Sequence, residues 1–194
     1  MTRTGGAPRT VSAWSTSMLL QCAAFGAITA VLIVALAPLT HSIALLSPVV
    51  YSLVGSVSSL GPLVAARWIR APGSLLLTAL VASLLALPFT ALGFLIVVAL
   101  GLPALTAELV LLASRFYSRP RETVWYLASA GLALVLFAIS LAVIDPAAMS
   151  PWVVVFTFAG RMLSVLLLAA VAVRVEKALA TSGVRRRYRG RTDT

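Results

Sequence analysis

The stretch Arg67-Trp68-Ile69-Arg70-Ala71-Pro72-Gly73 is followed by SLLLTALVASLLALPFTALGFLIVVALGLPALTAELVLLAS (residues 74–114) and then by Arg115-Phe116-Tyr117-Ser118-Arg119-Pro120-Arg121. Glu108 is the one charged residue of the apolar stretch. Because a helix needs about 20 apolar residues to cross a membrane, residues 74–114 are long enough to cross it and return. Both flanks are basic, and the positive-inside rule places basic flanks in the cytoplasm. The stretch therefore predicts a helical hairpin in a membrane.

The remainder of the chain repeats this alternation of basic and uncharged connectors. Arg3 and Arg9 precede the first apolar run, and the basic residues from Arg174 to Arg191 follow the last. The connectors after the first, third and fifth apolar runs contain no Lys or Arg. The sequence predicts an all-α integral membrane bundle of six transmembrane helices with both the N and the C terminus cytoplasmic. The predicted spans are Met18 to Ala37, Ile43 to Ala66, Gly73 to Leu92, Gly93 to Ser114, Val124 to Ile144 and Trp152 to Val173.

The composition supports a membrane protein. Apolar residues make up 61% of the chain, charged residues 10%, and the mean hydropathy is +1.06, which leaves too little polar surface for a soluble domain. The net charge of +10 lies beside the span ends, where it meets anionic lipid headgroups, so a nucleic-acid partner is not expected. We expect one domain over residues 1–194 in the plasma membrane, with a cytoplasmic leader at 1–17 and a basic cytoplasmic tail at 185–194.

Prolines are expected to shape the spans. Pro38 falls at a predicted junction, where a missing amide proton costs least. Pro62, Pro88 and Pro103 fall within spans, where they predict kinks or short re-entrant stretches packed inside the bundle.

Several kinds of chemistry are not expected. The chain lacks G-x-x-x-x-G-K-[ST], so any ATP-driven work needs a partner. The single His41 and the single Cys22 have no companions at metal-ligand or disulfide spacing, so neither a metal nor another cofactor is expected. Outside Glu108 and Arg161 no cluster of polar residues is evident at one depth, so the sequence does not predict an enzyme.

Glu108 and Arg161 are ionisable residues inside predicted spans, where charge is costly. Two interpretations remain open: a buried ion pair that locks the fourth and sixth spans together, or residues that line a ligand cavity. Aromatic side chains near the outer half could stack on a flat ligand. The residues expected to bind a substrate are therefore Tyr51, Phe89, Trp152, Arg161 and Glu108.

The first span carries small residues four positions apart. Ala23 and Ala27 form one such pair, and Gly26 and Ala30 form another. Small residues at this spacing let helices approach closely in a membrane. They predict an interface with a partner subunit.

Five short motifs between about Leu46 and Val184 resemble a known family: Ser47-Pro48-Val49-Val50-Tyr51, Arg67 to Gly73, Thr106-Ala107-Glu108-Leu109, Arg161, and Leu179-Ala180-Thr181-Ser182-Gly183-Val184. In these residues the chain resembles the substrate-binding S components of energy-coupling factor (ECF) vitamin transporters. The family it resembles most is YkoE, which is linked to thiamin and its hydroxymethylpyrimidine precursor. The resemblance implies six helices, a vitamin pocket open near the outer face, and a first helix that docks on a membrane coupling (T) subunit powered by two ATPase subunits.

The sequence departs from the thiamin-binding relatives at three places. Those relatives carry carboxylates early in helix two and along helix three, where this chain has Ser52, Ala79 and Ala86. The expected function is therefore an S component for a vitamin or related small nutrient, either thiamin or its precursor or a neutral or anionic compound. The alternative is a non-catalytic membrane assembly subunit without its own ligand.

Overall fold

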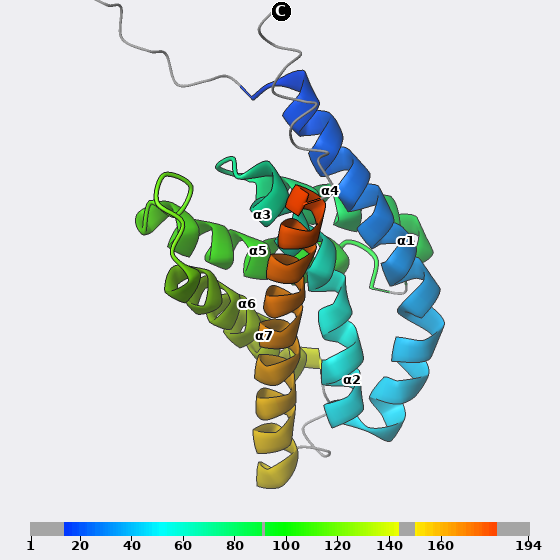
Figure 1. Cartoon of the computed structure of the whole chain (residues 1–194). Coiled ribbons are helices and arrows are strands. Elements are labelled where there is room, and N and C mark those ends of the chain that lie inside the picture. Colours follow the sequence, from blue (N-terminus) through cyan, green and yellow to red (C-terminus); the bar gives the residue numbers. More distant parts are fainter. Residues whose placement is uncertain (1–13, 91, 144–149, 182–194) are drawn as a thin grey trace, which may run out of the picture.

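The computed structural model describes residues 14–90, 92–143 and 150–181, and within them every regular element is helical (Figure 1). The all-α class predicted from the sequence is confirmed. The elements are α1 (Thr16–Leu46), α2 (Pro48–Gly55), the 3₁₀ turn η1 (Ser56–Ser59), α3 (Leu60–Ile69), α4 (Ser74–Ala86), the 3₁₀ turn η2 (Leu87–Phe89), α5 (Leu95–Ala113), α6 (Glu122–Val143) and α7 (Pro151–Thr181).

Among the described residues, five helical segments are long and apolar enough to cross a membrane. They are α1, the continuous segment Val49–Ile69 formed by α2, η1 and α3, and the helices α5, α6 and α7. The segment Ser74–Phe89, made of α4 and η2, is equally apolar but shorter. Each of the six predicted spans thus corresponds to a helical segment of this multi-pass membrane protein.

The first span is longer than predicted. Helix α1 continues through Pro38 to Leu46, so the prediction that Pro38 lies at a junction is wrong. Proline removes one backbone hydrogen bond, which a long transmembrane helix tolerates. The chain turns instead at Ser47, whose hydroxyl accepts a hydrogen bond from the amide of Val50, with Pro48 at the first position of α2.

Prolines within the spans have different effects. Pro62 lies in the first turn of α3, directly after η1, and its ring nitrogen cannot donate to the carbonyl of Ser58. Pro88 lies in η2, where α4 ends. Pro103 lies inside α5 without ending it. The predicted irregularity is therefore present at Pro62 and Pro88, whereas helix α5 continues past Pro103.

Helix α1 packs closely on α3 and α4 through small residues. A Cβ atom added at Gly61 of α3 would lie 1.7 Å from the Thr29 hydroxyl of α1, and one added at Gly26 of α1 would lie 2.7 Å from a methyl carbon of Val81 in α4. Only glycine permits these approaches.

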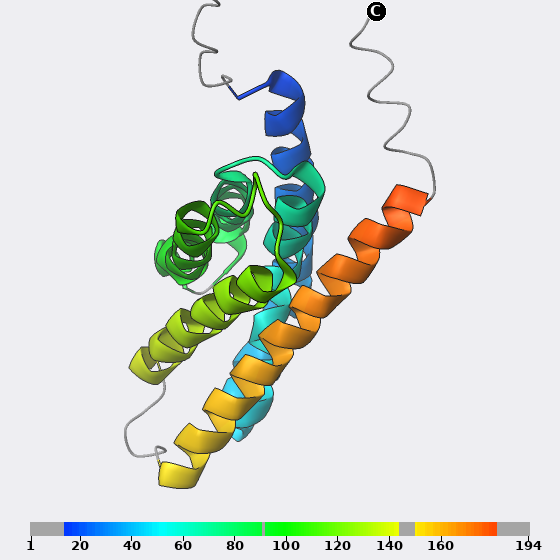
Figure 2. The same ribbon diagram turned by 60° about the vertical axis from the view of Figure 1, so that its left-hand side comes forward.

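Helix α1 begins, and α7 ends, at the same end of the bundle as the α3–α4 and α5–α6 connectors (Figures 1 and 2). These segments contain Arg67, Arg70, Arg115, Arg119, Arg121 and Lys177, and we call this end the basic end. The opposite end contains the α1–α2 turn and the start of α7, whose described residues hold no Lys or Arg. Apart from the buried Arg161, the basic residues of the described structure are thus segregated to one end of the molecule, as the sequence predicted.

Candidate functional site

Arg161 lies in the interior of the bundle. It belongs to α7, and only 3% of its surface is exposed. One guanidinium nitrogen, Nη1, donates to the Ser56 hydroxyl of η1 at 3.2 Å, and the other, Nη2, donates to the Ser140 hydroxyl of α6 at 2.6 Å. The guanidinium carbon lies 5.9 Å from the ring centroid of Tyr51 in α2. Arg161 therefore joins α7 to α6 and to the first two elements of the second span, α2 and η1.

Two further hydroxyl groups are buried on the helices that carry Tyr51 and Arg161. Ser52 lies one turn before Ser56 in α2, and Thr157 lies one turn before Arg161 in α7, and all four side chains are buried. Within the described part of the chain, the Thr157 hydroxyl and the Nε atom of Arg161 have no hydrogen-bond partner. Buried polar atoms are normally paired, so these two atoms are unsatisfied donors or acceptors within the described part of the chain.

Two glycines leave room for this arrangement. A Cβ atom added at Gly55 would lie 3.2 Å from Nη1 of Arg161, and one added at Gly160 would lie 3.0 Å from the Ser52 hydroxyl. Both distances are tighter than ordinary contacts. The sequence therefore places glycine where the guanidinium and the hydroxyl approach the helix backbones.

Glu108 is bound elsewhere, at the start of α4. Its carboxylate accepts hydrogen bonds from the backbone amides of Gly73 at 2.8 Å and Leu75 at 3.2 Å, and from the Tyr117 hydroxyl at 2.7 Å. A carboxylate at a helix N-terminus satisfies amides that lack partners and is stabilised by the helix dipole. The two ionisable residues therefore do not form the ion pair considered above, because each has its own partners.

The tyrosine beside Glu108 lies in the α5–α6 connector. Burial, and then the negative charge of Glu108, raise the pKa of Tyr117 well above its ordinary value. The phenol therefore remains protonated and donates to the carboxylate. Gly73, with φ of +84°, supplies the left-handed backbone that turns its amide into this cap.

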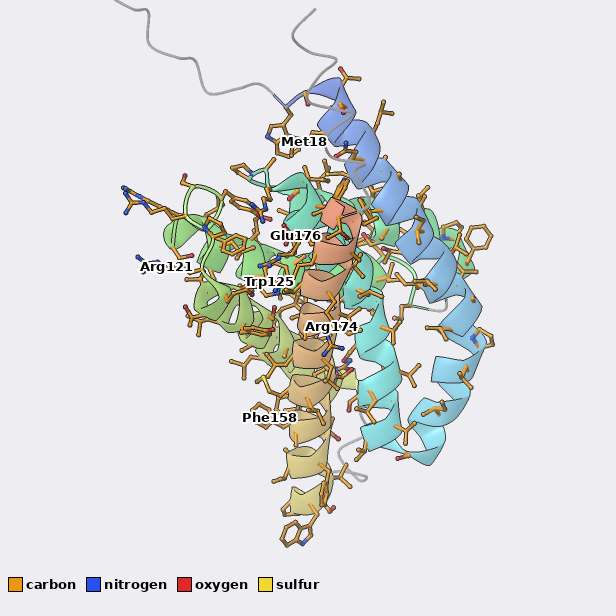
Figure 3. All side chains as sticks on the ribbon, in the orientation of Figure 1. Met18, Arg121, Trp125, Phe158, Arg174 and Glu176 are labelled. Atoms are coloured by element: carbon orange, nitrogen blue, oxygen red, sulfur yellow. The ribbon has the colours of Figure 1, made fainter. Side chains whose placement is uncertain are left out.

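A second group of charges lies at the basic end and was not singled out from the sequence. Arg67 donates to Glu176 of α7 at 2.8 Å and to Glu122 of α6 at 3.1 Å, and Arg70 also donates to Glu176. The guanidinium carbon of Arg67 lies 5.1 Å from the ring centroid of Trp125. Two carboxylates within otherwise basic segments were the signal in the sequence that could have identified this group. Figure 3 shows Glu176 towards the basic end of α7 and Phe158 towards the other.

The aromatic candidates divide into two groups. Tyr51 lies beside Arg161, as described above. Phe89 and Trp152 are 65% and 72% exposed on the surface of the bundle. The structure therefore brings together Tyr51 and Arg161, and leaves Phe89, Trp152 and Glu108 in other places.

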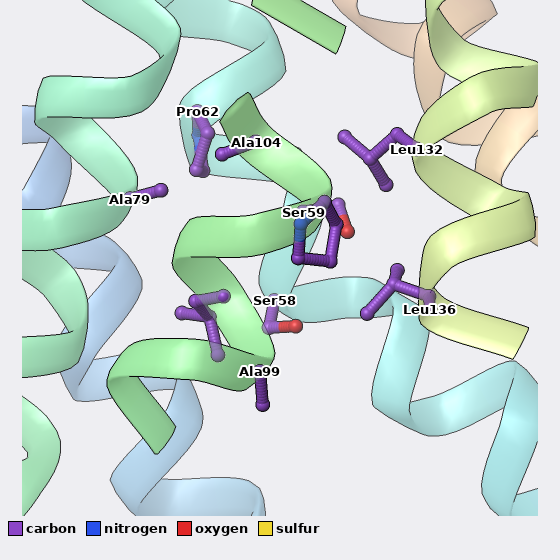
Figure 4. Close-up of a pocket in the computed structure, with 10 residues that line it drawn as sticks. Ser58, Ser59, Pro62, Ala79, Ala99, Ala104, Leu132 and Leu136 are labelled. Atoms are coloured by element: carbon purple, nitrogen blue, oxygen red, sulfur yellow. The ribbon is translucent and has the colours of Figure 1, made fainter. Parts of the chain in front are cut away.

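A small cavity of about 20 Å³ lies between α3, α4, α5 and α6 (Figure 4). Its lining includes Ser58 and Pro62 as well as Ala99 and Pro103, two pairs in which the proline cannot donate to the carbonyl four residues earlier. Leu136 also lines it, and the Leu136 carbonyl accepts a hydrogen bond from Ser140, whose hydroxyl contacts Arg161. This volume suits about one water molecule, so the cavity is too small for a nutrient.

The small residues of α1 face two directions. Gly26 is buried against α4, and Ala30, which is also buried, packs with Ala86 and Ile96. The prediction that this pair serves a partner subunit is corrected, because both residues are covered within the chain. Ala27 is exposed and Ala23 is half-buried, so this pair stays a candidate for such an interface.

Comparison with known proteins gives one clear likeness. No protein-family model matches the chain, and no curated protein matches it. A solved structure described as the crystal structure of an S-component of ECF transporter superposes with a TM-score of 0.78 at 24% sequence identity, covering 94% of this chain and 99% of that chain. The protein therefore has the fold of an S component of an energy-coupling factor transporter, as the sequence resemblance implied.

Proposed function

We propose that the protein is the substrate-binding S component of an ECF-type importer in the plasma membrane. The observation that carries this proposal is the shared fold, which extends over almost the full length of both chains. The protein would bind a vitamin or related small nutrient and perform no chemistry on it. Thiamin and its hydroxymethylpyrimidine precursor remain candidates through the resemblance to the YkoE family.

The buried cluster around Arg161 supports a binding role. Ionisable residues inside a membrane are costly, and where they occur they usually mark a substrate or ion pathway. Ser56 lies eight residues from the start of α2, and Arg161 lies ten residues from the start of α7. At 1.5 Å per residue these positions are about 12–15 Å from the opposite end of the bundle. A nutrient entering from that end would meet Arg161 near the middle of the membrane.

The proposed orientation places the basic end in the cytoplasm. Basic connectors remain on the cytoplasmic side of membranes, and there they meet anionic lipids. Both termini would then be cytoplasmic and the substrate site would open to the outside.

The proposed partners are a transmembrane coupling (T) subunit and two ATPase subunits. The sequence contains no P-loop motif, so ATP-driven import needs ATPase subunits supplied by partners. The exposed face of α1, formed by Ala24, Ala27, Ile28 and Val31, offers small and aliphatic side chains to another helix. We propose that this face contacts the coupling subunit.

Co-purification tests this function. The full chain is co-expressed with the coupling subunit and both ATPases of its host, and the complex is captured through a tag on the coupling subunit. Wild type should be retained and Ala27→Trp largely lost, because tryptophan prevents close helix approach. Ala138→Trp, on an exposed position of α6, is the matched control and should be retained.

Vesicles that contain the captured complex then distinguish the two functions considered. ATP-dependent uptake of a labelled vitamin would support the S component. A stable complex that takes up no nutrient would favour the assembly subunit, and failure of wild type to join the complex would overturn the proposed function.

A further inference from the structure

The charge of Arg161 has no carboxylate beside it in the described structure. Its hydrogen-bond partners among the described residues are two serine hydroxyls, and its guanidinium carbon lies 5.9 Å from the ring centroid of Tyr51. Hydroxyl groups solvate a guanidinium but do not neutralise it. Removing an ion from water costs several kcal/mol even after relaxation, unless an opposite charge is close.

The described carboxylates are all engaged at other places. Glu108 caps α4, Glu122 contacts Arg67, and Glu176 contacts both Arg67 and Arg70. The other two acidic residues of the sequence, Asp145 and Asp193, lie outside the described residues. The buried cluster as described therefore carries a net positive charge.

The serines that contact Arg161 do not depend on it. The Ser56 hydroxyl donates its proton to the Ser52 carbonyl at 2.8 Å, and the Ser140 hydroxyl donates to the Leu136 carbonyl at 2.8 Å. Each serine thus uses its proton within its own helix and offers only lone pairs to the guanidinium. If Arg161 only locked the helices together, an uncharged residue of similar size would serve at lower cost.

The unsatisfied atoms at the site are ones that bind oxyanions. In arginine, the Nε and Nη donors lie side by side and can bind a carboxylate or phosphate in a bidentate manner. Among the described residues Nε of Arg161 has no partner, and neither has the Thr157 hydroxyl one turn away on the same helix. Tyr51, in the first turn of α2, lies nearer the opposite end than Ser56 and is half-buried.

We propose that Arg161 binds the oxyanion of a small anionic nutrient, a carboxylate or a phosphate, with Thr157 and Tyr51 as further contacts. This inference rests on the proposed function and specifies its substrate class. The anion would neutralise the buried guanidinium and occupy its Nε donor. A cationic ligand without an acidic group would be repelled by the same charge.

Matched pairs of compounds test this substrate class. The melting temperature of the purified full chain in detergent is measured with each member of three pairs. The pairs are nicotinate and nicotinamide, pantothenate and panthenol, and thiamin monophosphate and thiamin. A ligand that binds the folded state raises the melting temperature according to its affinity. We expect an anionic member of these pairs to stabilise wild type, and its uncharged or cationic counterpart to bind at least about tenfold more weakly.

Variants assign the effect to Arg161. Arg161→Gln should weaken anion binding by at least about tenfold, because a hydrogen bond from a charged donor is lost. Arg174→Gln, the same change at an exposed position of α7, should leave binding unchanged. Without ligand, Arg161→Gln should melt at or above the wild-type temperature, since it removes a buried unpaired charge, whereas a purely structural lock predicts a lower temperature. If Arg161→Gln fails to fold, Arg161→Lys and Thr157→Val are measured in its place, and both should weaken binding while the protein remains folded.

The outcomes separate this inference from the proposed function. Binding of only the uncharged or cationic members, equal anion binding by wild type and Arg161→Gln, or no binding of any anion would overturn the inference. If the chain still joins the coupling subunit, the proposed function survives that result. Lipid phosphate is the other source of an oxyanion, so the melting is repeated in nanodiscs of phosphatidylglycerol or phosphatidylcholine. Arg161-dependent stabilisation by phosphatidylglycerol without any response to soluble anions would overturn the assignment to a nutrient.

Discussion

Glu108 illustrates how a single buried carboxylate is accommodated at the residue scale. Its carboxylate accepts hydrogen bonds from two backbone amides and one phenol, which together use three of its lone pairs. The amides belong to the N-cap residue Gly73 and to Leu75 in the first turn of α4, so the side chain fixes where this helix begins relative to α5. A residue that resembles a substrate ligand in the sequence thus has a structural role in the described fold.

Removing the Glu108 carboxylate should therefore destabilise the protein. We expect Glu108→Ala to lower the free energy of unfolding by about 3 kcal/mol, because buried donors lose their acceptor, and Glu108→Gln to lower it by about half as much. Unfolding in mixed micelles measures both changes. Thr106→Val, on the same helix, is the control and should cost less than about 1 kcal/mol, since the Thr106 hydroxyl bonds only within its own helix. Unchanged stability in Glu108→Ala would contradict this role.

Tyr117 makes stability depend on pH in the alkaline range. Its pKa is raised in the folded state, so the folded protein holds the phenolic proton more tightly than the unfolded chain, whose tyrosines ionise near pH 10. The contribution of Tyr117 is thus fully present below about pH 10 and is lost as the pH rises above it. Melting across this range should show a smaller loss for Tyr117→Phe than for wild type. Tyr126→Phe, at an exposed tyrosine, should lose stability with pH as wild type does. Equal slopes of melting temperature against pH for all three proteins would refute the assignment of this effect to Tyr117.

At the scale of helices, close approach decides the packing. The α1–α3 contact depends on the absence of a side chain at Gly61, where even a methyl group would meet Thr29 and the backbone carbonyl of Phe25. The α3–α6–α7 contact depends instead on charge, because Arg67 lies between Glu122 and Glu176 beside Trp125. Both contacts fix the position of α3, which leads from η1 to the basic end.

Two glycine substitutions separate steric from conformational effects. Gly61→Ala should lower the free energy of unfolding by about 2–3 kcal/mol, as overpacking does in a tight core, and Thr29→Ala should restore part of the loss. Gly131→Ala in α6 is the matched control, because its new methyl group would lie 3.7 Å from the nearest atom. This variant should be neutral or more stable by up to about 1 kcal/mol, owing to higher helix propensity. Equal effects of the two changes would argue against the α1–α3 contact.

At the scale of the whole molecule, polarity is arranged along the membrane normal. Basic residues and their carboxylate partners are gathered at one end, and the hydroxyl-rich cluster around Arg161 lies between the two ends. The proposed importer function requires this asymmetry, since substrate would enter from one side and the ATPases would act on the other. Because the number of crossings is even, the start of α1 and the end of α7 lie at the same end of the bundle. The proposed partners would act at that end.

Labelling in intact cells checks the orientation. In a Cys22→Ser background, we introduce Ser118→Cys in the exposed α5–α6 connector at the basic end and Ser150→Cys before α7 at the opposite end. A membrane-impermeant maleimide added outside should label Ser150→Cys and not Ser118→Cys, because the positive-inside rule holds the basic connector in the cytoplasm. Both sites should react after the membrane is opened. The reverse pattern would invert the topology and the direction of substrate entry.

The sequence by itself determined the fold class, the approximate spans and the segregation of basic residues. These properties follow from hydropathy and charge along the chain, because the length and flanking charges of each segment decide whether and in which direction it crosses the membrane. It also identified Arg161 and Tyr51 as candidates, because an ionisable or hydroxylated side chain in an apolar span is conspicuous without any knowledge of its neighbours.

Only the tertiary structure decided which side chains meet. Arg161 and Ser56 are 105 positions apart, and Glu108 and Gly73 are 35 positions apart, so no local pattern could pair them. Nor could spacing show that Gly26 and Ala30 face α4 while Ala27 faces outward, since that depends on the rotation of α1 against its neighbours. Hydropathy sets how deep a residue lies in the membrane, but contact also requires the right direction, and direction is set by how the helices pack.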